Sequence, residues 1–87
     1  MRAMRIHYFA AARAAAGVRE EEVGEFPTLG HLLDDATSRH TGTTDAGLSL
    51  ADVVERCTFL VDGARAGRDR SLEGAARVDV LPPFAGG

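Results

Sequence analysis

Apolar and polar residues alternate in the first segment of the chain. Met4, Ile6 and Tyr8 fall on one face of an extended backbone, and the residues between them are polar. Successive side chains of a β-strand point to opposite faces, so this pattern predicts a half-buried strand over residues 4–9. Phe9 is the one apolar residue on its polar face.

The next two segments predict a connection and a second strand. Residues 10–16 are alanine except for one arginine, and Gly17 follows. Alanine favours a helical turn, but seven residues are too few to hold a helix alone, so we expect a compact connection that reverses the chain. Residues 18–26 suit a second strand, in which Glu20 to Glu22 favour a solvated sheet edge.

Two later segments show the spacing of one-sided helices. Thr28 is a suitable N-cap for the first, which has apolar residues at i, i+3, i+4 and i+7 and ends near residues 41–44. The second is short and begins with the capping-box pair Ser49 and Asp52. Each helix needs a sheet to cover its apolar stripe. The stripes are Leu29, Leu32, Leu33 and Ala36 in the first helix, and Leu50, Val53, Val54 and Cys57 in the second.

Further strands complete the predicted fold. Residues 58–61 are a short apolar run that ends at the hairpin-type turn Asp62-Gly63, and residues 77–81 alternate until Pro82-Pro83 stops the strand. Between them lies an arginine-rich polar stretch with room for one short strand. The order of elements predicts a single α+β domain, residues 1–81, with a mixed sheet packed on one main helix and a second, short helix.

Composition narrows the classes of partner. The net charge is −3, and all ten basic residues are arginine. The chain lacks the positive excess usual in nucleic-acid binders and the lysine that a Schiff base or P-loop requires. A single cysteine forms no internal disulfide, and no apolar run approaches the roughly 18 residues of a membrane span. We therefore expect a cytoplasmic protein with no nucleic-acid or membrane partner.

The inventory of catalytic residues is thin. His7, His31 and His40 lack metal-ligand spacing on one element, and isolated histidines are most often surface or capping residues. Cys57 closes an apolar stripe, which is typical of a small buried hydrophobe rather than a nucleophile. The sequence contains neither a nucleophile elbow nor a phosphate-binding glycine loop. We expect a non-enzymatic chain without a bound metal or cofactor, so a partner would supply any catalyst.

The C-terminus carries the clearest signal. Pro82-Pro83 ends the last strand, and Gly86-Gly87 ends the chain, with Phe84 and Ala85 between them. Tails are commonly frayed, but extended backbone at about 3.3 Å per residue lets residues 82–87 reach roughly 20 Å from the sheet. Glycine has no Cβ, so a glycine pair passes through a channel that excludes any side chain. The pattern predicts a projecting tail that presents its terminal carboxylate to another protein's nucleotide site.

Three segments resemble the MoaD branch of the MoaD/ThiS sulfur-carrier family. They are residues 5–13, 59–63 and 78–87, of which the Pro-Pro-x-x-Gly-Gly end is the most specific. One departure is Gly74-Ala75, where the family often has Gly-Asp. The resemblance implies a β-grasp, ubiquitin-like fold. It also implies that an E1-like enzyme of the MoeB/ThiF type adenylates Gly87 with MgATP and that a terminal thiocarboxylate follows. Two such carriers would then insert their tails into a MoaE-like dimer of large subunits and donate sulfur to precursor Z, which makes molybdopterin.

Strand parity predicts a contact patch on the sheet face away from the helices. With the buried strand residues turned toward the helices, Phe9, Leu60 and Leu81 fall on the other face. Exposed apolar patches usually mark partner sites, and the family resemblance implies docking through this face. The alternative is that the loop over residues 65–70 covers part of the patch.

Three other functions stay open. The same tail chemistry would also serve thiamine thiazole or cysteine biosynthesis, although the chain length and the helix near residues 49–57 favour the MoaD branch. A β-grasp interaction module without tail chemistry would tolerate extension past Gly87. Protein modification through Gly87 would share the activation step and end in an isopeptide bond on a target.

Overall fold

The computed structural model describes residues 4–83, which form one five-stranded sheet and three helices. The predicted α+β architecture is confirmed. In chain order the elements are β1 (Met4–Tyr8), α1 (Ala10–Ala16), β2 (Glu20–Val23), α2 (Leu29–Arg39), α3 (Leu50–Val54), β3 (Thr58–Val61), β4 (Ala64–Ala66) and β5 (Arg77–Leu81).

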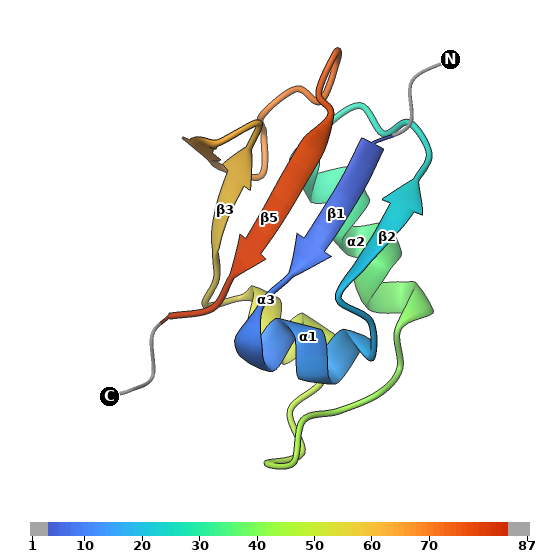
Figure 1. Ribbon diagram of the computed structural model, residues 1–87, viewed down its shortest axis with the longest axis vertical. Coiled ribbons are helices and arrows are strands. Elements are labelled where there is room, and N and C mark those ends of the chain that lie inside the picture. The colour runs from blue at the N-terminus through green and yellow to red at the C-terminus, as the bar shows by residue number, and fades with distance from the viewer. Residues whose placement is uncertain (1–3, 84–87) are drawn as a thin grey trace.

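The sheet is mixed, with the strand order β2-β1-β5-β3-β4. The first and last strands, β1 and β5, pair in parallel at its centre, and the other neighbouring pairs are antiparallel. Helix α2 crosses one face of the sheet, while α1 and α3 lie at the end toward which β1 and β5 point (Figure 1). This is the β-grasp arrangement. We call the face opposite α2 the open face.

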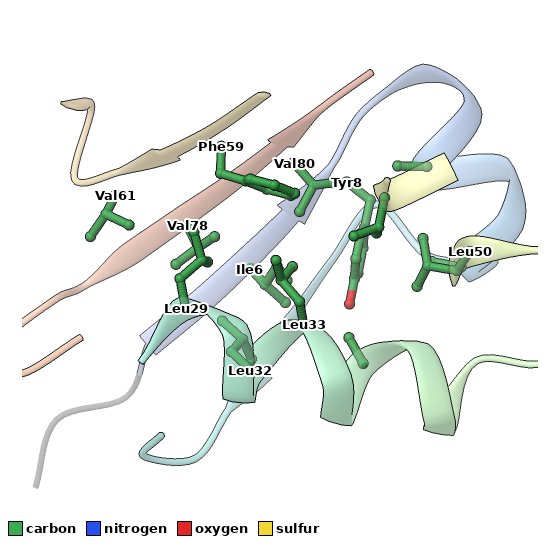
Figure 2. Close-up of a cluster of buried hydrophobic side chains, with 14 of the residues drawn as sticks. Ile6, Tyr8, Leu29, Leu32, Leu33, Leu50, Phe59, Val61, Val78 and Val80 are labelled. Carbon is green, nitrogen blue, oxygen red and sulfur yellow. The ribbon is translucent and has the colours of Figure 1, made fainter. Parts of the chain in front are cut away.

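Strand residues and the apolar stripe of α2 meet in one core (Figure 2). The register places Ile6 beside Val78 and Val78 beside Val61, and all three are fully buried. Burying side chains of this size stabilises the fold by about 1.5–3 kcal/mol each. The predicted inward faces of these strands are therefore confirmed. The α2 residues of this core are Leu29, Leu32, Leu33 and Ala36.

The alanine stretch forms a helix, α1, and our prediction of a mere connection was wrong. Such a short helix is marginal alone, so packing must hold it. Ala12 and Ala15 are buried in the core, where their small side chains permit close approach. Gly17 ends the helix in the left-handed region (φ 80°), and its N–H donates to the Arg13 carbonyl at 2.8 Å. The expectation failed because it considered the segment without its neighbours.

Local capping signals set the other helix starts as predicted. The Thr28 hydroxyl accepts a hydrogen bond from the His31 N–H at 3.3 Å. Ser49 and Asp52 form both hydrogen bonds of the capping box, each at 3.1 Å. Helix α3 ends earlier than expected, at Val54, and Cys57 lies beyond it.

Both edge strands are short. Strand β2 occupies only four residues of the predicted range 18–26, and β4 follows β3 through a tight turn. Asp62 and Gly63 both have positive φ, 49° and 84°. This is the type I′ geometry, which suits glycine and matches the twist of a hairpin. Short edges limit pairing with strands of other molecules.

Candidate functional site

Strand β5 fixes the base of the predicted tail. It pairs with β1 on one side and β3 on the other, and the ladder with β3 extends to Leu81, opposite Thr58. Pro82 and Pro83 follow directly, and proline cannot donate to a further ladder bond. The base therefore starts from the centre of the sheet, at the end near α1 and α3 (Figure 1). The predicted tail residues Phe84, Ala85, Gly86 and Gly87 lie outside the described residues.

A groove of about 370 Å³ lies beside this base, between α1, α3 and the proline pair. Leu48, in the loop before α3, is 44% exposed on its rim. Any protein that takes up the tail must approach this part of the surface. The lining residues are Ala11, Leu48, Asp52, Val53, Glu55, Arg56, Pro82 and Pro83.

The open face carries the three residues of the predicted patch. Leu60 and Leu81 are half-buried, and Phe9 is 39% exposed. Phe9 directly follows β1, and its N–H donates to the Val80 carbonyl at 3.2 Å, which keeps it beside the end of β5. These side chains place apolar surface next to the tail base. Their role in docking stays a prediction.

The arginine-rich loop binds the start of α2 rather than lying over the patch. The Leu29 N–H donates to the Arg70 carbonyl at 2.9 Å, and Arg68 Nη2 contacts Asp34 Oδ1 at 2.6 Å. Helix α2 lies on the other side of the sheet, so these bonds draw the loop away from the open face. Only Arg65, on β4, stands beside the patch.

A buried carboxylate also lies on the open face, and the sequence pattern did not indicate it. Asp79 is 8% exposed, and Arg77 Nε donates to its Oδ1 at 2.7 Å. The register sets Asp79 between His7 on β1 and Leu60 on β3, whose side chains limit its contact with water. A buried charge without a partner is costly, so the arginine accounts for its presence. The alternation of the sequence correctly predicts that Asp79 faces away from the core. It does not indicate that neighbouring side chains cover this carboxylate.

A second polar cluster was also missed. The register pairs Glu21 with Ile6, so the middle glutamate of the acidic run faces the helix side. It accepts a hydrogen bond from the Tyr8 hydroxyl at 2.6 Å and contacts Arg39 at 3.0 Å and His40 at 2.7 Å. Burial by itself would raise the pKa of Glu21, but the hydrogen bonds from these three residues lower that pKa to about 2. The cluster ties β2 to the end of α2.

Histidine and cysteine have local partners in residues 4–83. His31 contacts the N-cap threonine, and His40 contacts Glu21. Cys57 Sγ donates to the Val53 carbonyl at 3.2 Å. Burial raises the pKa of the Cys57 thiol to about 11, so it is protonated at neutral pH and a poor nucleophile. This part of the chain contains no group of three or more potential metal ligands.

Residues 6–87 match the model of the ThiS family. No curated protein matches the sequence. Among residues 4–83, no helix has the length and apolar character that a membrane span requires.

Solved structures with the same fold include two of SAMP1, small archaeal modifier protein 1, from Haloferax volcanii. One is 26% identical with a TM-score of 0.67, and the match covers 98% of this chain and 99% of that one. The other is 23% identical with a TM-score of 0.69, covering 97% and 100%. A protein from Pyrococcus furiosus, provisionally described as molybdopterin converting factor, subunit 1, is 21% identical with a TM-score of 0.64, covering 97% and 100%.

Proposed function

Because this chain belongs to the ThiS family, we propose that it is a sulfur carrier that works through the carboxylate of Gly87. An E1-like enzyme of the MoeB/ThiF type joins this carboxylate to AMP, and pyrophosphate leaves the enzyme's MgATP. Sulfide delivered by a donor then attacks the acyl carbon, AMP leaves, and the chain ends in a thiocarboxylate. The carrier needs no cofactor of its own, and the reaction takes place in the cytoplasm.

The observation that carries the proposal is how β5 leads into the tail. A central strand, paired on both sides, ends at a proline pair four residues before the end of the chain. The prolines restrict the backbone and so reduce the entropy lost when the tail enters a partner. Gly86 and Gly87 then offer the carboxylate without side chains to obstruct a channel.

For the sulfur acceptor we favour the precursor of molybdopterin. The Pro-Pro-x-x-Gly-Gly end and the helix α3 (Leu50–Val54) support the MoaD branch over the shorter thiazole carriers. In this scheme the thiocarboxylate enters a MoaE-like large subunit and transfers sulfur to precursor Z. Purified carrier in its thiocarboxylate form should make molybdopterin with that subunit. If the carrier transfers sulfur only in the presence of a thiazole synthase or a cysteine-forming enzyme, it serves thiamine thiazole or cysteine biosynthesis instead.

Protein modification is the second candidate, because SAMP1 is 26% identical over nearly the whole chain. The activated Gly87 would then acylate a lysine of a target protein. This chain has no lysine, so no side-chain amine of an attached copy can accept a second copy. Target peptides whose lysine carries residues 78–87, the segment that trypsin leaves after cleaving at Arg77, would establish this role.

Intact mass spectrometry of the protein from its native host tests the carrier function. We expect a species in which one oxygen is replaced by sulfur, and we expect a variant without Gly87 to lack it. Absence of this species while the sulfur-transfer enzymes are present would refute the carrier proposal. Sulfur acceptance by the variant without Gly87 would refute the role of that residue.

A further inference from the structure

An arginine on the open face is held in one orientation with part of its guanidinium free. Arg77 Nε donates to Asp79 Oδ1 at 2.7 Å, and the Arg77 side chain is 50% exposed while that of Asp79 is only 11% exposed. Within residues 4–83, the terminal nitrogens of Arg77 have no hydrogen-bond or ion-pair partner. A guanidinium fixed through Nε still presents its two terminal amino groups, and these fit a carboxylate.

The charges around Arg77 leave this cation uncompensated beyond its bond to Asp79. Arg5 stands beside it on β1, but Arg5 bonds to Glu20 at 3.0 Å and approaches Glu22 at 4.0 Å. The two glutamates of β2 on this face are thus engaged by Arg5 and not by Arg77. His7, also on β1, lies near Glu20 at 4.0 Å. On the far side, Arg65 of β4 has no ion pair among the described residues.

These arginines and the apolar patch divide the open face into two halves. Leu81 and Phe9 lie at the end where the tail begins, whereas Arg77 lies at the opposite end of β5. Leu60 lies between the halves, with Asp79 on one side and Arg65 on the other. The face therefore offers apolar contact near the tail base and a positive charge farther from it.

We propose that Arg77, positioned by Asp79, binds a carboxylate side chain of the enzyme that adenylates Gly87. The inference rests on the proposed function and names the chemistry of the docking partner. A protein side chain, and not the nucleotide, is the expected ligand. Residues 82–87 in extended conformation would reach roughly 20 Å from one end of β5, whereas Arg77 lies at the other end of that strand. Since Asp79 already restricts the arginine, binding costs less side-chain entropy than it would for a free arginine.

The test measures adenylation of the carrier by the E1-like enzyme of the same organism, as ATP–pyrophosphate exchange. The main variant is Arg77→Met with Asp79→Asn. It removes both charges of the pair, so no buried carboxylate is left without its partner. Arg77→Glu is the charge reversal. Arg19→Glu is the matched control, because its register with Tyr8 puts it on the helix side. Circular dichroism confirms that each variant is folded.

We expect both Arg77 variants to raise the KM for the carrier about tenfold with kcat unchanged, and to flatten its dependence on salt. Arg19→Glu should keep the KM within about twofold, since it leaves the docking face intact. Asp79→Asn alone should give an intermediate KM, because the arginine keeps its charge but loses its fixed orientation. Wild-type KM in the folded double variant would overturn this inference alone. Failure of the wild-type chain to be adenylated would overturn both this inference and the proposed function.

Discussion

Glu21 shows how one residue takes a role that its immediate neighbours do not share. It lies between Glu20 and Glu22, yet the pleat turns it toward the helices, where Tyr8, Arg39 and His40 surround it. The three partners hold it as a carboxylate, with a pKa of about 2 against an ordinary value of 4.5. A lower pKa in the folded state means that protonation favours unfolding.

Glu21→Gln should therefore destabilise the protein at neutral pH, by about 1–2 kcal/mol after allowance for solvent screening. The stabilisation by Glu21 is complete above pH 4.5 and is lost as the pH falls toward 2, so the difference between wild type and variant should shrink over that interval. Urea unfolding followed by circular dichroism at several pH values measures it. Glu22→Gln is the control, because Glu22 is largely exposed and its nearest cation is 4.0 Å away. Equal effects of the two variants would contradict the role of the cluster.

At the scale of the element, α1 depends on its cap and its packing more than on its length. Its buried face consists of alanines, and it contacts α3 and the central strands. Gly17 lets the chain leave the helix at φ 80°, a conformation that other residues adopt at a cost. The space around it is open, since a Cβ there would meet nothing within 4 Å. The requirement for glycine is thus one of backbone conformation alone.

Gly17→Ala should lower the free energy of unfolding by about 1 kcal/mol, the cost of a left-handed alanine. Gly24 provides a matched comparison: a Cβ there also meets nothing within 4 Å, but its φ is not positive. Gly24→Ala should leave the stability within about 0.5 kcal/mol of wild type or raise it slightly. Thermal and urea denaturation measure both. An equal loss in the two variants would show that space, rather than φ, matters at Gly17.

At the scale of the whole molecule, the side chains that stabilise the fold and those that are free to contact a partner lie on opposite faces of the sheet. One face packs on α2 and contains the core (Figures 1 and 2). The open face holds the patch and the Arg77–Asp79 pair. Substitutions on the open face should therefore alter binding more than folding. Phe9 is the best place to test this, because it is 39% exposed and occupies the N-cap of α1 without a side-chain capping bond.

Phe9→Asp should weaken binding to the activating enzyme about tenfold while leaving the melting temperature nearly unchanged. Aspartate is a favoured N-cap residue, which offsets the lost contacts of the ring, but it removes apolar surface from the patch. Calorimetric titration and thermal melting measure the two effects. Leu48→Asp compares the two surfaces, because Leu48 is 44% exposed on the rim of the groove beside the tail base and not on the sheet face; it should weaken binding less than Phe9→Asp. Equal weakening by both variants would place docking around the tail base instead of on the sheet.

Sequence reasoning predicted the features that depend on local pattern. Alternation gave the buried faces of β1 and β5, and the caps at Thr28 and Ser49 gave the starts of both later helices. These features depend on residues a few positions apart, so a single segment carries enough information. The tail motif ending at Gly87 also stands in the sequence alone, and its chemistry stays a prediction.

By itself, then, the sequence determined the order of the strands and of the two later helices, the side of each strand that faces the core and the glycine end that suggests the function. Only the tertiary structure decided that residues 10–16 form a helix, that Glu21 is enclosed and that Asp79 is buried between His7 and Leu60. The physical reason is common to all three. Each depends on desolvation and contact between segments far apart in the chain, and such contacts exist only once the sheet has brought β1 and β5 together.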